Sequence, residues 1–217
     1  MLRLFGFSGS ANLAPHMVLE ELGLPYEYVE LNNEKQEHKS AEYLKLNPNG
    51  RVPTLVDGEQ VLYEAAAICL DLCERVAKTE LLPPAGTPAR SQVYKWLMFL
   101  TNTLQPALIG YFYPGRYSTD ASHADAIKAQ AEITAQNLYR QLDAELGRLG
   151  PYLTGETCTV ADLFLFMLVR WGRWFAAPPA TTLPNIARLV ALVSERPAVQ
   201  RAYAQEGIAA PYCLLAQ

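Results

Sequence analysis

The sequence predicts an α/β domain followed by an all-helical domain. In the first part of the 217-residue chain, short strand-like segments alternate with helical stretches, whereas the rest shows helical periodicity alone. A proline-rich segment, Leu81 to Pro88, separates the two patterns. We therefore expect domains at residues 1–79 and 89–217, joined by a linker at residues 80–88.

The first domain begins with a predicted strand, helix and strand. Leu2 and Leu4 open the first strand, and residues 13–22 place their apolar side chains on one helical stripe that Gly23 ends. Residues 26–31 form the second strand. This order is the unit in which a crossover helix joins two parallel strands.

A hairpin and another helix complete the first domain. Strands at residues 54–56 and 61–63 flank Asp57-Gly58, a strong two-residue turn signal. A short helix at residues 41–44 precedes the hairpin, and a helix from Glu64 to Val76 follows it. The order β-α-β-(α)-β-β-α is that of a thioredoxin-like sheet, although the redox Cys-x-x-Cys motif is absent.

The second domain is predicted to consist of helices at residues 89–110, 124–149, 160–174, 186–194 and 198–205. Gly150-Pro151 ends the second of them, and Pro197 stands near the start of the last. Thr159 and Asp162 form a capping box at the start of the third. We expect this box to stabilise the fold and to have no part in chemistry.

Composition excludes several kinds of partner. Only 18% of the residues are charged, 50% are hydrophobic, and no apolar run is long enough to span a bilayer, so we expect a soluble globular protein. A net charge of −4 without any basic run argues against nucleic acid as a partner. The start of the chain lacks a secretory signal, which favours a cytoplasmic protein. No zinc pattern accompanies the cysteines, which we expect to be reduced core residues: Cys69, Cys73, Cys158 and Cys213.

The hairpin carries a predicted ligand site at Pro53. Proline cannot donate to a sheet ladder, and a tight turn there, with a cis bond as one option, would leave the N–H and C=O of Val52 free to pair with an extended ligand. Glu64 and the first amides of the following helix offer a carboxylate beside N–H donors, which suits a free amino-acid end. A buried hairpin with an ordinary helix cap fits the same residues equally well.

The segments Asn47 to Leu55 and Tyr63 to Ile68 resemble the glutathione-binding half of the glutathione transferase family. In that pattern a cis-proline turn pairs with the cysteinyl backbone of glutathione, and an acidic residue and a serine at the next helix start hold the γ-glutamyl group. The resemblance extends over nearly the whole chain. It implies that glutathione contacts Val52, Pro53, Glu64 and Ala65. The family usually has serine at position 65, so one hydrogen bond worth about 0.5–1.5 kcal/mol is missing and binding should be weaker.

Further polar residues stand before the hairpin. His38 and Lys39 occupy a position that resembles the segment in which related enzymes hold the glycine carboxylate of glutathione, and Arg51 could help them. The alternative is that all three are solvated residues on a loop. Of the other histidines, we expect His16 to be packed and His123 to be exposed.

The candidates for thiol activation lie between the first strand and the first helix. Ser8, Ser10 and Asn12 suit helix capping, but a serine hydroxyl and helix amides can also stabilise a thiolate. In the theta-like and delta-like branches of the family a serine near the end of this strand does so, and the matching residue is Ser10. Asn12 is the second candidate, with its side chain expected to cap the helix.

The chain lacks the residues that activate the thiol in other branches of the family. Phe5 and Phe7 occupy the strand on which tyrosine-type transferases carry their hydroxyl group. Ala11 and Gln105 stand where the bacterial beta branch has its cysteine and histidine. The resemblance therefore implies a serine-type enzyme.

Aromatic residues gather at the end of the first helix of the second domain. Such a stripe is more often core than pocket, but the helix breakers Pro114-Gly115 among them favour a lined cleft. By resemblance this wall would face the thiol and take an apolar electrophile. The predicted electrophile-binding residues are Phe7, Tyr111, Tyr113 and Tyr117.

The resemblance predicts a glutathione transferase that uses glutathione as co-substrate, without a metal, and adds its thiolate to an apolar electrophile. A glutathione-dependent isomerase or dehalogenase of the same fold is an alternative, as is a non-catalytic family member that serves interaction or regulation. The family also implies a homodimer, with the helix from Glu64 to Val76 near the contact.

Overall fold

The structure, a computed structural model, describes residues 1–214, and its internal contacts divide the chain into two compact units. The first unit comprises Met1–Leu82 and Glu195–Ala209. The second unit comprises Pro83–Ser194 and the described residues from Ala210 onward. These units differ in one element from the predicted domains at residues 1–79 and 89–217, because the last helix belongs by its contacts to the first unit.

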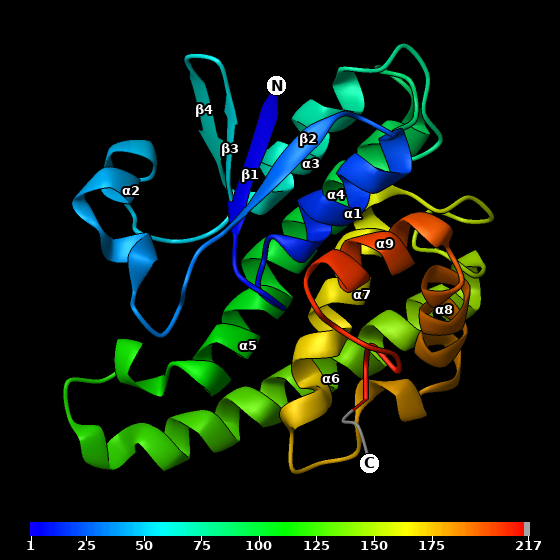
Figure 1. Cartoon of the computed structure of the whole chain (residues 1–217). Helices are drawn as coiled ribbons and strands as arrows, with labels where there is room; N and C mark the ends of the chain where they lie inside the picture. Colours follow the sequence, from blue (N-terminus) through cyan, green and yellow to red (C-terminus); the bar gives the residue numbers. More distant parts are fainter. Residues whose placement is uncertain (215–217) are drawn as a thin grey trace. The chain divides into compact units, whose positions relative to one another are not determined.

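The first unit is built on a four-stranded sheet with the order β2-β1-β3-β4 (Figure 1). The parallel pair expected from the crossover helix is present, as is the antiparallel hairpin. The hairpin strand β3 also pairs antiparallel with β1, which places it inside the sheet. The strands are β1 (Leu2–Gly6), β2 (Tyr26–Glu30), β3 (Thr54–Asp57) and β4 (Gln60–Tyr63).

Helices cover both faces of this sheet. On one face Leu4 and Leu55, paired across β1 and β3, are buried under the helices α1 and α3, which pack on each other. On the other face Phe5 and Val56 form a cluster with Tyr43 of α2. The helices are α1 (Leu13–Leu22), α2 (Ala41–Leu46) and α3 (Ala65–Glu74), with a short 3-10 turn at Glu37–Lys39 before α2. As predicted, Gly23 ends α1 in the left-handed conformation, with φ of 63°.

The last helix, α9 (Pro197–Gln205), packs against α1. It buries Ala198, Val199 and Ala202. An ion pair between Arg196 and Glu21, with N···O distances of 2.5 and 2.8 Å, joins the two helices near the start of α9. This packing explains why the first unit takes in a helix that the sequence pattern assigned to the helical domain.

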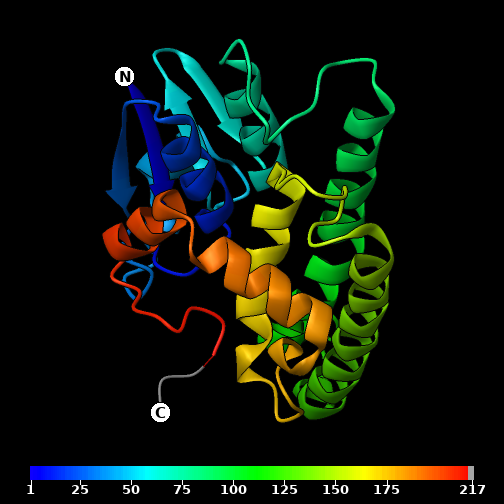
Figure 2. The same ribbon diagram turned by 90° about the vertical axis from the view of Figure 1, so that its right-hand side faces the viewer.

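The second unit is helical throughout its described part (Figures 1 and 2). The predicted helix at residues 89–110 is α4 (Pro88–Phe99) and α5 (Gln105–Phe112), joined without a break by a π-helical turn at Leu100–Leu104. The other helices are α6 (Ala124–Leu149), α7 (Val160–Trp171) and α8 (Pro184–Ser194). Every residue of α7 from Val160 to Arg170 is buried, so α7 is the core around which α4, α5 and α8 pack.

A buried carboxylate starts α7. Asp162 has no exposed surface and accepts hydrogen bonds from the N–H of Leu153 at 2.7 Å and from the N–H and hydroxyl of Thr159, each at 2.8 Å. The predicted capping box is therefore confirmed. Burial outweighs these hydrogen bonds and raises the pKa of Asp162 to about 6.

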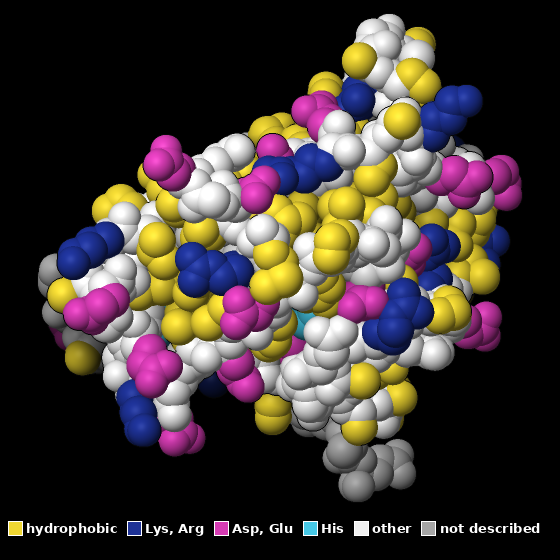
Figure 3. All heavy atoms as spheres, turned by 45° about the horizontal axis from the view of Figure 1, so that its top comes forward, with side chains coloured by type: hydrophobic (Ala, Val, Ile, Leu, Met, Phe, Trp, Pro, Cys, Tyr) yellow, Lys and Arg dark blue, Asp and Glu magenta, His cyan; other side chains and the backbone are white. Residues whose placement is uncertain are grey.

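No helix within the described residues is long and apolar enough to cross a membrane. On the face drawn in Figure 3, charged side chains of both signs are interspersed with hydrophobic ones.

We expect Asp162→Ala to lower the free energy of unfolding by about 2–5 kcal/mol, because it leaves the buried N–H groups of Leu153 and Thr159 without acceptors. Asp125→Ala, which removes an exposed carboxylate at the start of α6, should cost less than about 1 kcal/mol. Urea unfolding followed by circular dichroism measures both. Equal losses in the two variants would contradict the role given to Asp162.

Candidate functional site

The strand register brings several loop segments to one edge of the sheet in the first unit. Phe5 pairs with Thr54 and Thr54 with Tyr63, so the chain that leaves β1, the chain that enters β3 and the chain that leaves β4 lie at the same edge. In Figure 1 this is the edge at which α3 begins. Neighbouring strands are about 4.8 Å apart, so these segments form one continuous surface.

The first of these segments is the turn at Pro53. The Val52–Pro53 peptide bond is cis, the option that the sequence left open. Two hydrogen bonds to the Arg51 carbonyl hold the turn in place. They come from the Tyr43 hydroxyl at 2.7 Å and from the Asn47 side chain at 2.8 Å. Within the described residues, the backbone N–H and C=O of Val52 have no hydrogen-bond partner.

The second segment is Glu64, which links β4 to α3. Its φ of 76° and ψ of 109° are unusual for a residue with a side chain and cost about 1–3 kcal/mol. The carboxylate is exposed and forms no hydrogen bond to the described part of the chain. Beyond it, α3 begins with the N–H groups of Ala65, Ala66 and Ala67, which have no intrahelical acceptors. Free amide donors and a free carboxylate therefore lie side by side, as the sequence predicted.

The third segment, residues 7–12, joins β1 to α1 and is called the Ser10 loop below. Asn12 within it is fully buried. Its Oδ1 accepts hydrogen bonds from the Phe7 N–H at 3.1 Å and from the Ser10 hydroxyl, and its Nδ2 donates to Glu206 at 2.8 Å and to the Tyr28 hydroxyl at 3.4 Å. All four hydrogen-bonding positions of the amide are thus occupied.

This geometry corrects one expectation. The Asn12 side chain does not cap α1, because its oxygen is turned back to the loop. Ser10, by contrast, is partly exposed, and its hydroxyl can rotate about the Cβ–Oγ bond to donate to a ligand in place of Asn12.

His38 lies beside the Ser10 loop. Its ring is 5.6 Å from that of Phe7, and its Nδ1 is buried without a hydrogen-bond partner. Burial, followed by the nearby Lys39 ammonium, lowers the pKa of His38. Lys39 itself donates to the Gly50 carbonyl at 2.6 Å and so fixes the turn before Pro53, whereas the exposed Arg51 forms no side-chain hydrogen bond to the described residues.

The three tyrosines predicted to bind an electrophile occupy different environments in the second unit. Tyr111 is buried, its ring centroid lies 4.7 Å from that of Phe175 with the two rings tilted, and its hydroxyl donates to the Trp174 carbonyl at 2.6 Å. Tyr113 is 48% exposed and lies under the Arg116 guanidinium. The three side chains therefore differ in exposure and in their partners.

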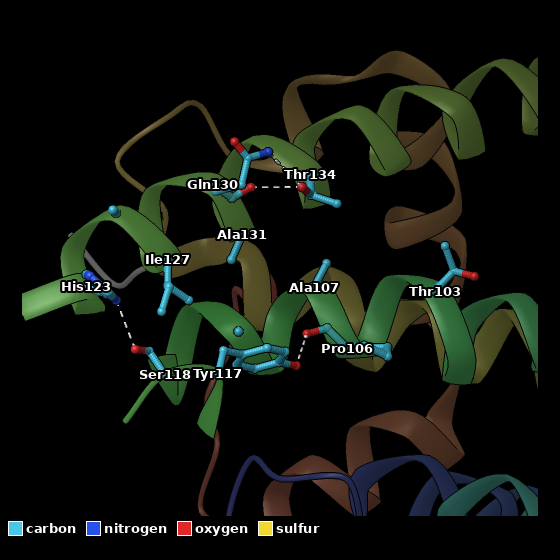
Figure 4. A pocket seen from close by; sticks show the side chains of 12 residues that line it. Thr103, Pro106, Ala107, Tyr117, Ser118, His123, Ile127, Gln130, Ala131 and Thr134 are labelled. Carbon is cyan, nitrogen blue, oxygen red and sulfur yellow. Dashed lines mark hydrogen bonds between the residues drawn. The ribbon is translucent and has the colours of Figure 1, made fainter. Parts of the chain in front are cut away.

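Tyr117 lines an open pocket of about 690 Å³ between α5 and α6 (Figure 4). Its ring lies along α5, and its hydroxyl donates to the Pro106 carbonyl at 3.1 Å. Ile127 and Ala131 of α6 face it across the pocket. The pocket is bordered mainly by apolar groups.

The histidines and cysteines outside the site behave as expected. His16 is fully buried and His123 is exposed. The four cysteines are free and buried. No group of three or more His, Cys, Asp or Glu side chains in the described chain is arranged to hold a metal ion.

Sequence reasoning missed Glu206, which follows α9 and reaches into the Ser10 loop. Its carboxylate accepts from the Gly9 N–H at 2.9 Å and from Asn12, and its carbonyl accepts from the Ser8 hydroxyl at 2.7 Å. Nearly 200 residues separate these partners, and nothing in the local pattern around Glu206 distinguishes it from other helix-end carboxylates.

Both parts of the chain match family models. Residues 1–70 match the model described as "Glutathione S-transferase, N-terminal domain" and residues 103–206 the one described as "Glutathione S-transferase, C-terminal domain". Glutathione S-transferase GstA of Escherichia coli O157:H7 is 29% identical over 209 residues, 95% of this chain and 100% of that protein. Glutathione S-transferase GstB of Escherichia coli K12 is 31% identical over 210 residues, 93% of this chain and 97% of that protein.

A solved structure shows the same arrangement of elements. The crystal structure of a glutathione transferase homolog from Sulfitobacter, with bound glutathione, aligns with a TM-score of 0.88 at 26% identity. The alignment covers 96% of this chain and 99% of that one.

We expect the pKa of His38 to lie below its ordinary value, with burial as the main cause and Lys39 as the second. Lys39→Gln should therefore raise the pKa of His38 only part of the way back, and Lys35→Gln should leave it unchanged. NMR titration of the imidazole protons measures this. A full return to the ordinary value in Lys39→Gln would show that burial is not the main cause.

Proposed function

Because this chain belongs to the glutathione S-transferase family, we propose that its first unit binds glutathione beside the Val52–Pro53 turn and that Ser10 stabilises the glutathione thiolate. The chain is a glutathione transferase. One observation carries the proposal: unpaired backbone groups at Val52, an unpaired carboxylate at Glu64 and the free amides that open α3 lie at one edge of the sheet.

Each part of glutathione has a chemically suitable partner at this edge. The Val52 backbone would pair with the cysteinyl residue through its N–H and C=O, held in place by the Pro53 turn. The first amides of α3, beginning at Ala65, would bind the γ-glutamyl carboxylate, and Glu64 the γ-glutamyl ammonium. The glycine carboxylate would meet His38 and Arg51, with Lys39 adding positive charge.

The chemical step requires an ionised sulfur. A thiol of ordinary pKa, about 8.5, is only a few per cent ionised at neutral pH, so a donor to the sulfur raises the reactive fraction. On binding, the Ser10 hydroxyl would rotate away from the Asn12 Oδ1 and donate to the thiolate, since a hydrogen bond to an anion is stronger than one to an amide. The thiolate then forms a C–S bond to the electrophilic carbon, whose leaving group departs or whose strained ring opens.

The supporting role of Asn12 follows from its burial. With its amide fully engaged, Asn12 has no donor left for the sulfur. We assign it the task of holding the Ser10 loop.

The second substrate in this proposal is an apolar electrophile. Phe7, half-buried directly after β1, presents an apolar ring three residues before Ser10. Tyr113 and Tyr117 are candidates through their exposed ring surfaces, and Tyr111 is a candidate through the family resemblance alone, since it is buried. We further infer a cytoplasmic homodimer with α3 near the contact, which the family and the four free cysteines support.

The activity is tested by calorimetry with glutathione, followed by conjugation assays with aryl halides and epoxides and by an assay of glutathione oxidation by peroxides. Saturable binding together with conjugation of at least one electrophile is the expected result. Glutathione binding without any conjugation would favour the interaction or regulatory alternative.

We expect Glu64→Ala to weaken glutathione binding roughly ten- to a hundredfold, because it removes a charge-assisted hydrogen bond of about 1.5–3 kcal/mol. Ala65→Ser should tighten binding slightly, since it adds a hydroxyl donor. Glu59→Ala, an exposed carboxylate in the neighbouring hairpin turn, serves as the control and should bind like the parent. Equal calorimetric affinities for Glu64→Ala and the parent would place the γ-glutamyl site elsewhere.

We expect Ser10→Ala to raise the pKa of the bound glutathione thiol and to lower turnover, with little change in glutathione affinity. The pH dependence of thiolate absorbance in the binary complex measures the pKa directly. Ser91→Ala, on the exposed side of α4, is the control. If the thiol pKa stayed unchanged in Ser10→Ala, Ser10 would not be the activating group.

A further inference from the structure

The end of α9 is tied to the Ser10 loop by a carboxylate without any exposed surface, that of Glu206. One carboxylate oxygen accepts from the Gly9 N–H at 2.9 Å and the other from the Asn12 Nδ2 at 2.8 Å. The Glu206 carbonyl accepts from the Ser8 hydroxyl at 2.7 Å. Glu206 therefore contacts the loop on both sides of Ser10.

The Glu206 carboxylate also contacts His16 of α1. The His16 Nδ1 is 2.7 Å from Glu206, and its Nε2 is 2.8 Å from the Tyr26 hydroxyl and 3.3 Å from the Gln205 side-chain oxygen. The Glu206 side chain is therefore hydrogen-bonded to α1 through His16 as well as to the Ser10 loop.

Docking of α9 on α1 does not depend on Glu206 alone. The helices are also joined by the Arg196–Glu21 pair and by an Arg201–Glu20 pair at 2.6 Å. Apolar side chains of α9 are buried in the same contact. What Glu206 adds to this contact is its set of hydrogen bonds to the Ser10 loop.

We propose that Glu206 is a positioning residue for Ser10, an inference that rests on the role proposed for Ser10 above. Glu206 accepts a hydrogen bond from the Asn12 Nδ2 and so fixes the orientation of the Asn12 amide. The amide oxygen then faces the Phe7 N–H and the Ser10 hydroxyl. The hydrogen bond from the Gly9 N–H to the Glu206 carboxylate fixes the backbone directly before Ser10. Ser10 is held between two anchored neighbours, so its hydroxyl reaches the sulfur from a defined position.

The test compares Glu206→Gln with Glu21→Gln, which removes another tie between α1 and α9 but leaves the loop alone. The amide introduced by Glu206→Gln would place an N–H donor against one of the two loop donors, the Gly9 N–H or the Asn12 Nδ2. We expect Glu206→Gln to raise the pKa of the bound glutathione thiol by about one unit and to lower kcat about tenfold. The glutathione Kd should change less than about threefold, because Val52 and Glu64 lie in other segments. Glu21→Gln should match the parent in all three measurements, and an equal shift in both variants would overturn the proposal.

A double-mutant cycle shows whether Glu206 acts through Ser10. If it does, Ser10→Ala combined with Glu206→Gln has the same thiol pKa as Ser10→Ala alone, whereas additive shifts overturn the proposal. If Ser10→Ala raises the thiol pKa but Glu206→Gln does not, this inference fails and the role of Ser10 stands. If Ser10→Ala does not change the thiol pKa, both the proposed role of Ser10 and this inference are wrong.

A second variant keeps the test decisive if Glu206→Gln does not fold. Ser8 is exposed, and Ser8→Ala removes only the bond to the Glu206 carbonyl. A smaller rise in the thiol pKa that disappears in the Ser10→Ala background supports the proposal. No rise in Ser8→Ala overturns it.

Discussion

The buried side chain of Asn12 holds the segment on which the proposed chemistry depends. Its amide links the backbone of Phe7, the hydroxyl of Ser10 and the carboxylate of Glu206 in one hydrogen-bonded group. The space it occupies explains why β1 ends in glycine, since a Cβ at Gly6 would lie 2.3 Å from the Asn12 side chain. The chemistry proposed for Ser10 thus depends on a fully buried residue.

The rest of the site is preorganised by similar buried contacts. Tyr43 and Asn47 fix the Arg51 carbonyl, next to which the backbone polar groups of Val52 have no partner among the described residues. Glu64 is kept in a costly backbone conformation at the start of α3. Such strain persists only where the surrounding structure enforces it, and it is found most often at functional sites. In the proposed site, the free amides and the free carboxylate are both favourable partners for a zwitterion and would compensate in part for alanine at position 65.

Much of the fold could be predicted because its signals are local. Asp57-Gly58 predicted the hairpin turn, and Gly23 predicted the end of α1. Thr159 and Asp162 predicted the start of α7. Each of these signals is turn or cap chemistry confined to a few residues. The edge of the sheet that carries the proposed glutathione site follows from the same signals together with the family resemblance. Contacts between distant segments could not be predicted in this way. The pairing of Glu206 with the Ser10 loop, the packing of α9 on α1 and the inward orientation of Tyr111 all depend on tertiary packing that helical periodicity does not encode. The prediction that the Asn12 side chain caps α1 was wrong for the same reason, because its Oδ1 accepts from the Phe7 N–H instead.

A crystal structure of the complex with glutathione tests the central claim most directly. The account predicts that the cysteinyl backbone pairs with Val52, that the γ-glutamyl group lies between Glu64 and the start of α3, and that the sulfur accepts a hydrogen bond from a Ser10 hydroxyl turned away from Asn12. A sulfur that lies out of reach of Ser10, with the Ser10 hydroxyl still bound to Asn12, would contradict it.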